Sequence, residues 1–271
     1  MIHRATPSRR RFGQHFLHEK HAIKRIVDAF APCPGEIIVE IGPGRGALTL
    51  ELLCRTDEVH AVEIDRDLVE WLRSELSHPG LIIHQADALR FDFGALAKNS
   101  ARLRIIGNLP YNISTPLLFH LLEFGEQIQD MCLMLQREVA ERVSAVPRSK
   151  AYGRLTVMVQ SHCEVRKLLI LGSGAFTPAP KVESAVIQLI PLRTNRYGIA
   201  DRPYFAELVR RAFAQRRKTV RNALKPLLDD ACFDAAGVDG HLRPEQLGIE
   251  HYARLSAVRR DASRTQRESA L

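Results

Sequence analysis

A buried strand that runs into a glycine-rich loop and then a helix is the feature that most restricts the fold of this chain. The apolar run 37–41 predicts a short strand, and residues 47–53 have helical character. Between them lies Gly42-Pro43-Gly44-Arg45-Gly46. A strand, a tight turn and a helix in this order begin a βαβ unit, and in open α/β sheets ligands bind at such a turn.

Strand and helix patterns keep alternating over the first 190 residues. The predicted strands are 37–41, 59–64, 81–84, 103–106, 131–136, part of 155–165, and 184–191. The predicted helices lie at about 23–30, 47–53, 66–76, 115–124 and 138–145. Strands that alternate with helices favour a doubly wound parallel sheet. The predicted fold class is therefore α/β, with a Rossmann-like, mostly parallel sheet of seven strands.

The pattern changes after Pro191. Residues 192–203 are typical of a linker, and apolar residues then recur at helical spacing, namely Phe205, Leu208, Val209, Ala212 and Phe213. A dense basic face follows over 215–221. We therefore predict an α/β domain over 1–192 with a basic N-terminal arm, a small all-helical domain over 198–262, and a mobile tail over 263–271.

The charge balance indicates an acidic partner. Lys and Arg outnumber Asp and Glu by 39 to 31, and the formal net charge is +8. This excess favours nucleic acid over a membrane surface, although a merely basic protein remains an alternative. The chain has no signal-like or membrane-length apolar run, so we expect a cytoplasmic protein without a membrane partner. The five cysteines are scattered and show no metal-ligand spacing, so we expect no metal and no disulfide framework.

The glycine-rich loop is preceded by an acid, Glu40. Its spacing is G-x-G-x-G and differs from the dinucleotide fingerprint G-x-G-x-x-G. A carboxylate at this place suits a cationic or amine-bearing ligand better than a pyrophosphate. S-adenosylmethionine carries both a sulfonium and an amino group. The alternative is a purely structural tight turn.

Two more acids follow the next two predicted strands. Glu63 ends the second strand, where an acid accepts hydrogen bonds from ribose hydroxyls in nucleotide-binding α/β folds. Asp87 follows the third strand and can accept from an adenine amino group, although a helix cap is the commoner role for such a residue. Neither acid alone identifies the cofactor, since NAD sites share the first feature.

Asn108-Leu109-Pro110-Tyr111 comes off the end of the fourth strand and is the most specific motif. An exocyclic adenine amine is a poor nucleophile, because its lone pair is delocalised into the ring. An Asn side-chain oxygen and a backbone carbonyl that accept its two protons favour the tetrahedral geometry needed for methyl transfer. Tyr111 can stack on the unpaired base, and Phe176 in the proline-rich loop 176–184 can clamp its other face. The alternatives are a simple proline turn and a core phenylalanine.

These motifs together resemble the ribosomal RNA adenine dimethyltransferase family. Within it, the chain is most similar to the bacterial enzymes that dimethylate two adjacent adenosines near the 3′ end of small-subunit ribosomal RNA. The resemblance extends over nearly the whole chain, through GQHFL, EIGPGRGALT, QADAL, GNLPYNISTPLLFHLL, FTPAPKVESAV and FAQRRKTVRNAL.

The resemblance implies S-adenosylmethionine as the methyl donor and a role for each matching residue. It implies a cofactor site of His15, Leu17, Gly42, Glu63, Asp87 and Asn108, and a catalytic corner of Asn108, Leu109, Pro110, Tyr111 and Phe176. His15 departs from the family, which most often has Asn there. The basic residues expected to hold RNA are Arg9, Arg10, Arg11, Arg216, Arg217, Lys218 and Arg221.

The implied function is N6,N6-dimethylation of small-subunit (16S) ribosomal RNA in the immature 30S particle, by a monomer. Adenine N6 would attack the methyl group in line, without a metal or a covalent enzyme intermediate. A compatible non-enzymatic role is an assembly checkpoint that blocks premature use of the subunit. The alternatives are a methyltransferase for large-subunit RNA, a DNA N6-adenine methyltransferase and, least favoured by the glycine spacing, a dehydrogenase.

Overall fold

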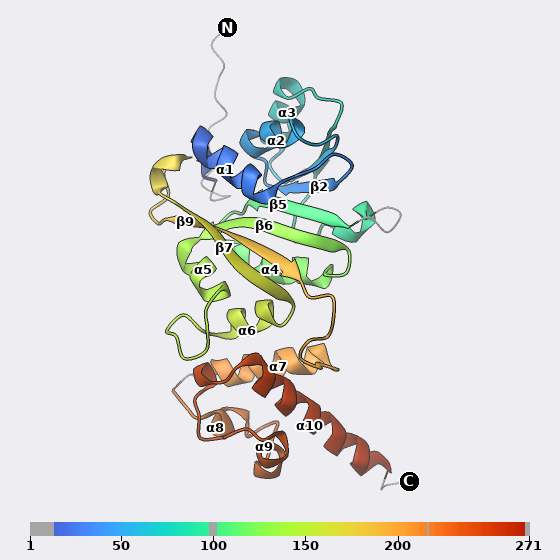
Figure 1. Ribbon diagram of the computed structural model, residues 1–271, viewed down its shortest axis with the longest axis vertical. Helices are drawn as coiled ribbons and strands as arrows, with labels where there is room; N and C mark the ends of the chain where they lie inside the picture. The colour runs from blue at the N-terminus through green and yellow to red at the C-terminus, as the bar shows by residue number, and fades with distance from the viewer. Residues whose placement is uncertain (1–13, 98–101, 216, 269–271) are drawn as a thin grey trace. The chain divides into compact units, whose positions relative to one another are not determined.

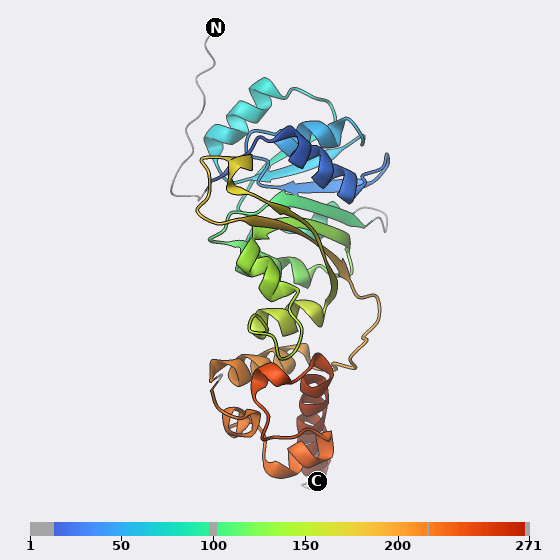
Figure 2. The ribbon, with the colours of Figure 1, turned by 60° about the vertical axis from the view of Figure 1, so that its left-hand side comes forward.

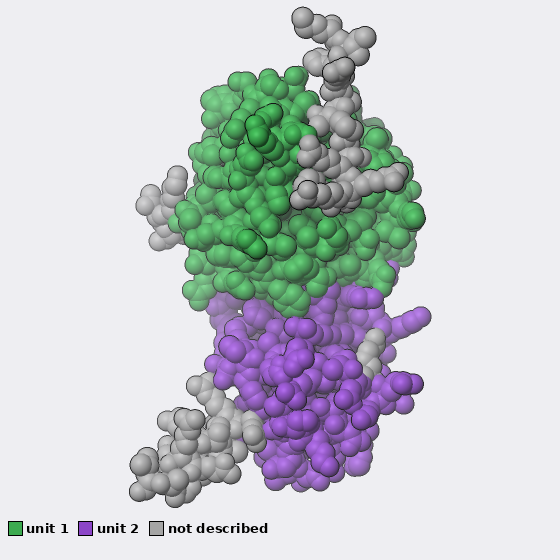
Figure 3. Space-filling model, turned by 180° about the vertical axis from the view of Figure 1, so that it is seen from behind, with its two compact units in different colours: residues 1–140, 164–191 green, residues 141–163, 192–271 purple. Residues whose placement is uncertain are grey.

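The computed structural model describes residues 14–97, 102–215 and 217–268, with side chains described as far as residue 258. These residues divide into two compact units, shown in different colours in Figure 3. The first unit consists of residues 1–140 and 164–191, and the second of residues 141–163 and 192–271.

A twisted sheet of seven strands forms the centre of the first unit (Figure 1). In chain order the strands are β2 (Ile37–Ile41), β3 (Val59–Glu63), β4 (Leu81–Gln85), β5 (Leu103–Asn108), β6 (Ile128–Gln136), β7 (Cys163–Leu171) and β9 (Ser184–Pro191). In space their order is β4-β3-β2-β5-β6-β9-β7. The strands from β4 to β6 pair in parallel, and β9 pairs antiparallel with β6. The predicted seven-stranded, mostly parallel sheet is confirmed.

Helices cover both faces of this sheet (Figures 1 and 2). On one side lie α1 (Lys20–Phe30), α2 (Ala47–Leu53) and α3 (Arg66–Glu75), and on the other lie α4 (Ser114–Glu123) and the beginning of α5 (Arg137–Val143). The helix α1 buries Ala22, Ile26, Val27 and Phe30, which follow helical spacing, in a core shared with α2 and the sheet. Its N-cap Glu19 accepts from two free backbone N–H groups, as an exposed helix start requires.

Strand register places the ends of three strands side by side. Ile41 of β2 pairs with Val62 of β3 and with Gly107 of β5. The residues that follow these partners therefore lie along one edge of the sheet, and they are Gly42, Glu63 and Asn108. A Cβ atom at Gly107 would lie 2.5 Å from the carbonyl oxygen of Ile41, so this close approach of β5 to β2 requires glycine.

A small second sheet stands beside this edge. β1 (Phe16–Leu17) pairs antiparallel with β8 (Phe176–Thr177), so that Leu17 lies opposite Phe176. The sequence analysis did not predict either strand, since two residues are too short for a periodic pattern. The pair joins the GQHFL segment to the proline-rich loop, which is about 160 residues away in the chain.

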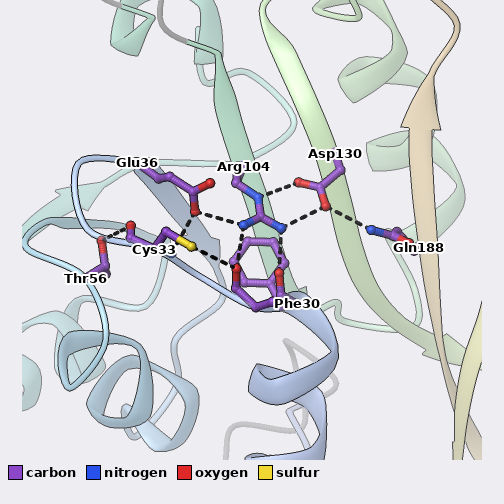
Figure 4. Close-up of polar contacts among 8 residues, drawn as sticks. Phe30, Cys33, Glu36, Thr56, Arg104, Asp130 and Gln188 are labelled. Carbon is purple, nitrogen blue, oxygen red and sulfur yellow. Dashed lines mark hydrogen bonds and ion pairs between the residues drawn. The ribbon is translucent and has the colours of Figure 1, made fainter.

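A buried arginine ties the opposite, amino-terminal end of β5 to its neighbours (Figure 4). The guanidinium group of Arg104 donates to both carboxylate oxygens of Asp130 on β6, at 2.8 and 3.0 Å. It also donates to Glu36 and to the carbonyl oxygens of Phe30 and Ala31, which end α1. Arg104 is only 7% exposed, and its partners raise its pKa further above the ordinary arginine value against the effect of burial. This single interruption of an apolar strand is therefore a structural crosslink.

The second unit is helical. It contains α6 (Arg154–Gln160), α7 (Arg202–Ala214), α8 (Val220–Leu224), α9 (Asp230–Ala236) and α10 (Ile249–Glu268). The unit includes more of the chain than the predicted domain 198–262, because the structure groups residues 141–163 with the C-terminal helices. The reason is packing: α6 contacts α7, and the ring of Tyr152 lies 6.1 Å from Phe213, which is 5.9 Å from Tyr252. The described part of the predicted tail 263–271 continues α10 as far as Glu268.

Candidate active site

A cavity of about 200 Å³ opens at the carboxyl ends of the parallel strands in the first unit. The GQHFL segment and the loops after β2, β3, β4 and β5 form its walls. Nine of the residues predicted for the cofactor or the catalytic corner line it, namely His15, Leu17, Gly42, Glu63, Asp87, Asn108, Leu109, Pro110 and Tyr111. The order of the strands reverses at β2, which lies between β3 and β5. In doubly wound sheets such a reversal opens a crevice where ligands bind.

The glycine loop forms the floor of the cavity by close backbone packing. Gly44 has φ of +57°, and a Cβ atom there would lie 3.0 Å from the ring of Phe16. The guanidinium group of Arg45 lies 4.8 Å from the centroid of the same ring. The loop is thus held against β1 by one aromatic side chain, and any larger residue at position 44 would displace it.

Three carboxylates face the cavity, and each of them accepts a hydrogen bond from the protein. Glu40 is 1% exposed and accepts from the hydroxyl of Thr49 at 2.6 Å. Glu63 is 6% exposed and accepts from the backbone N–H of Asp65 at 2.9 Å. Asp87 accepts from the backbone N–H of Leu89 at 3.0 Å, so it caps a turn and lines the cavity at once. A cavity walled by acids favours a ligand that carries positive charge.

Burial raises the pKa of two of these acids. Desolvation raises the pKa of Glu40 to about 7, against the Thr49 hydrogen bond, and the nearby charge of Glu63 adds to the increase. Desolvation also raises the pKa of Glu63, although backbone N–H groups of Asp65 and Gly44 oppose it. In both residues burial disfavours the charged carboxylate, and a cationic ligand beside it would stabilise that charged form.

We expect the Glu40 shift to make stability fall with rising pH. The folded protein holds the proton of Glu40 up to about pH 7, whereas the unfolded chain loses it near pH 4.5. This contribution is therefore complete below pH 4.5 and lost as the pH rises to about 7, and it amounts to about 3 kcal/mol. Urea unfolding of the ligand-free protein, followed through its single tryptophan Trp71 in the first unit, measures it. Glu40→Gln should flatten the profile over pH 5–7, and an unchanged slope in this variant would contradict the assignment.

Asn108 ends β5 with its side chain oriented by the backbone. Its amide nitrogen Nδ2 donates to the carbonyl oxygen of His15 at 2.8 Å. Because a carbonyl can only accept, this bond identifies which end of the amide is the nitrogen. The amide oxygen Oδ1 is then left as the acceptor at the cavity. The next residue, Leu109, donates its N–H to Met134 on β6 at 3.1 Å, which fixes the backbone of the motif.

Tyr111 and His15 form one aromatic wall of the cavity. Their ring centroids are 5.4 Å apart and the rings are tilted by 31°. The Nδ1 atom of His15 lies 2.7 Å from the carbonyl oxygen of Pro178 and donates to it. This bond ties the His15 ring, at a position where the resembled family most often has Asn, to the proline-rich loop. The hydroxyl of Tyr111 lies 2.7 Å from that of Ser184, and burial raises the pKa of Tyr111.

Phe176 lies in the core and not at the cavity. Its side chain is 3% exposed and packs in a cluster that includes Leu17 and Val186. It does not occur among the described residues that line the cavity. The prediction that Phe176 clamps the target base therefore differs from its position here. A two-residue strand needs a buried anchor, and Phe176 supplies it by holding β8 against β1.

Gln14 and Ile64 are among the cavity residues that were not predicted from the sequence as site residues. The amide of Gln14 donates to the carboxylate of Asp65 at 3.0 Å, which joins the GQHFL segment to the start of α3. Ile64 lines the cavity and is 47% exposed, which is unusual for a large apolar side chain. The available signal was an apolar residue directly after the acid Glu63; the predicted strand 59–64 included Ile64, whereas β3 ends at Glu63.

The predicted RNA-contacting residues are only partly described. Arg9, Arg10, Arg11 and Arg216 lie outside the described residues. Arg217 and Lys218 are exposed in the second unit. Arg221 is half-buried, and its guanidinium group lies 3.3 Å from the carboxylate of Asp230. Part of its charge is therefore neutralised within the unit.

Neither a metal-binding cluster nor a membrane-spanning helix occurs among the described residues. No group of three or more His, Cys, Asp or Glu side chains in this part of the chain is placed to hold a metal ion. Within the same residues, no helix is both long enough and apolar enough to cross a membrane.

Comparison with known sequences gives one family. Residues 5–259 match the family model described as "Ribosomal RNA adenine dimethylase". The chain is 49% identical over 257 residues to the "Ribosomal RNA small subunit methyltransferase A" of Shewanella sediminis, an alignment that covers 94% of this chain and 96% of the relative. It is also 49% identical over 250 residues to the protein of the same name from Acinetobacter baylyi, covering 92% of this chain and 91% of the relative.

Solved structures show the same fold. A dimethyladenosine transferase from Plasmodium falciparum superposes with a TM-score of 0.77 at 25% identity, covering 89% of this chain and 96% of that protein. The 23S rRNA methyltransferase ErmE superposes with a TM-score of 0.68 at 27% identity, covering 90% of this chain and 98% of that one. Both similarities extend beyond the cavity-bearing sheet.

Proposed function

The chain belongs to the ribosomal RNA adenine dimethylase family, and from this premise we propose that it transfers methyl groups from S-adenosylmethionine to adenine N6 in small-subunit (16S) ribosomal RNA. We propose two adjacent adenosines near the 3′ end as the target and N6,N6-dimethyladenosine as the product. The observation that carries this proposal is the oriented amide of Asn108 between the acid-walled cavity and the Tyr111 ring.

The residues of the cavity fit S-adenosylmethionine by their chemistry. Glu40 and Glu63 are buried carboxyl groups whose charged forms a sulfonium and an amino group would stabilise. Glu63 would accept from the ribose hydroxyls and Asp87 from the adenine amino group, while Ile64 would cover the adenine with an apolar surface. Gly42, His15, Leu17 and Asn108 would enclose the remainder. When bound, the cofactor supplies an electrophilic methyl group on sulfur.

The chain's own residues prepare the nucleophile. The Oδ1 atom of Asn108 and the carbonyl oxygen of Leu109 accept hydrogen bonds from the two N–H groups of the adenine amine. This draws the nitrogen lone pair out of the ring and stabilises the positive charge that develops on N6. The ring of Tyr111 stacks on the base, which must first leave its helical stack to reach the cavity.

Basic residues outside the cavity would hold the RNA backbone. Arg217 and Lys218 are exposed, and Arg9, Arg10, Arg11, Arg216 and Arg221 belong to the same proposal. We further propose that the protein acts as a monomer in the cytoplasm on the immature 30S particle. A protein with a formal charge of +8 is well suited to so negative a surface.

Binding to small subunits should weaken steeply with salt, and single charge removals should reduce that dependence. Lys218→Ala and Arg217→Ala are each expected to lower the slope of log K against log salt by about one, because each removes one phosphate contact. Lys218→Arg keeps the charge and should keep the slope. Equilibrium binding to immature subunits between low and moderate salt measures it, and identical slopes for Lys218→Ala and Lys218→Arg would remove this residue from the interface.

Primer extension along small-subunit RNA tests the proposed function. RNA from a strain that lacks the protein should be read through, whereas expression of the protein should restore two adjacent stops near the 3′ end. Read-through in both strains would overturn the proposal. Stops in large-subunit RNA alone would instead favour the second candidate, a large-subunit methyltransferase, which the similarity to ErmE supports at 27% identity.

A further inference from the structure

A buried serine hydroxyl makes direct contact with the tip of Tyr111. Ser184 is the first residue of β9, is 0% exposed and pairs with Gln136 at the end of β6. Its Oγ atom lies 2.7 Å from the hydroxyl of Tyr111. Tyr111 lines the cavity, whereas Ser184 is not among the described residues that do so. Any influence of Ser184 on the reaction therefore passes through Tyr111.

The ring of Tyr111 is restrained at its hydroxyl and by the neighbouring ring of His15. Ser184 holds the hydroxyl, and the tilted ring of His15 lies beside it. His15 is itself fixed, because its ring donates to Pro178 and its carbonyl accepts from Asn108. Tyr111 otherwise sits in an irregular turn between β5 and α4, where the backbone alone does not orient a side chain. The four polar and aromatic contacts thus preset the ring before any base arrives.

We propose that Ser184 is a positioning residue that holds the ring of Tyr111 in the orientation in which it stacks on the target adenine. This inference rests on the proposed function. A ring that is already ordered loses less rotamer freedom when the base stacks, and it holds the amine at the acceptors Asn108 and Leu109. Without the Ser184 hydroxyl, the ring samples other orientations, and fewer bound bases reach the reactive position.

Removing either hydroxyl breaks the same hydrogen bond. Ser184→Ala and Tyr111→Phe are each expected to lower kcat for methyl transfer about five- to tenfold, the value of one hydrogen bond. The double variant should lose no more than the larger single loss, because the bond can be lost only once. Ser184→Cys keeps a weaker donor of similar size and should recover part of the rate. Binding of S-adenosylmethionine should be unchanged in all four variants.

The second unit offers matched controls for both substitutions. Ser256 is 4% exposed, and its hydroxyl donates to the carbonyl oxygen of Ala253 at 2.7 Å. Tyr252 is 0% exposed, and its hydroxyl donates to the carbonyl oxygen of Pro244 at 2.7 Å. Neither residue lines the cavity. Ser256→Ala and Tyr252→Phe remove the same atoms from buried hydrogen bonds, Tyr252 being more deeply buried than Tyr111, and should leave kcat unchanged.

The experiment measures initial rates of methyl incorporation into immature small subunits at saturating S-adenosylmethionine. Calorimetry measures the affinity of each variant for the cofactor, and urea unfolding measures its stability. A wild-type rate for Ser184→Ala, losses that multiply in the double variant, or equal losses in the controls would overturn the positioning role. Absence of adenosine methylation by the wild-type protein would instead overturn the proposed function. If the wild-type protein methylates adenosine but the variants lose no rate, the positioning role fails while the proposed function stands.

Discussion

Asn108→Ala is expected to lower kcat for adenosine methylation by about 10²–10³-fold, the usual cost of removing one oriented acceptor or donor from a charge-stabilising site. In the structure, Nδ2 of Asn108 donates to the carbonyl oxygen of His15, which leaves Oδ1 as the acceptor that this cavity residue can offer. Alanine removes the acceptor for an amine proton and leaves the carbonyl of His15 without this donor. Initial rates of labelled methyl transfer to immature small subunits measure the loss.

Two further variants show whether the amide orientation matters. Asn108→Asp has the same shape but cannot donate to His15, so its carboxylate is repelled by that carbonyl and the rate should also fall strongly. Asn195→Ala removes an exposed amide that does not line the cavity and should retain most of the rate. A normal rate for Asn108→Asp would show that the hydrogen bond to His15 is dispensable.

Asn108→Ala also separates catalysis from the proposed assembly-checkpoint role. Asn108 lies at the cavity, whereas the exposed basic residues proposed to contact RNA lie in the second unit. Asn108→Ala should therefore sediment with immature subunits as the wild type does while methylation is lost. A parallel loss of binding would mean that Asn108 contributes to the RNA interface itself.

Arg104→Met is expected to destabilise the first unit by about 3–5 kcal/mol, the range found when one partner of a buried ion pair is removed. The carboxylate of Asp130 is 5% exposed and would keep only the amide of Gln188 among the partners drawn in Figure 4. The carbonyl oxygens of Phe30 and Ala31 would also lose a donor. Urea unfolding followed through Trp71 on α3 measures the effect in this unit.

The Arg104 prediction has two controls. In Arg104→Met/Asp130→Met both charges are absent, so the protein should be more stable than Arg104→Met alone. Arg66→Met removes an exposed ion pair with Glu70 and should leave the urea midpoint nearly unchanged. Rates of methyl transfer by the folded Arg104→Met protein should stay near the wild-type value, because Arg104 does not line the cavity. A single variant as stable as the wild type would show that Asp130 is neutral or hydrated.

The sheet was predictable because its strands are buried on both faces. Parallel strands covered by helices appear as continuous apolar runs, and the predicted 37–41 matches β2 at both ends. The antiparallel strand β9 is also mostly buried, and the predicted 184–191 matches it at both ends. β7 was poorly predicted, since charged residues such as Glu164, Arg166 and Lys167 interrupt it at an exposed place. The discontinuous second unit was not predictable either, because residues 141–163 join it through long-range contacts. Among these are α6 against α7, the ring of Tyr152 beside Phe213, and a backbone hydrogen bond from Arg148 to Glu245.

By itself, the sequence determined the fold class, the glycine loop, the strand-end acids and the Asn108–Tyr111 corner. These features depend on local periodicity and on residues near one another in the chain. Only the tertiary structure decided how the corner is assembled. The orientation of Asn108 depends on His15, that of Tyr111 on Ser184, and the β1–β8 pair assigns Phe176 to the core. These contacts join residues about 70 to 160 positions apart, and no local pattern encodes a contact across such a distance.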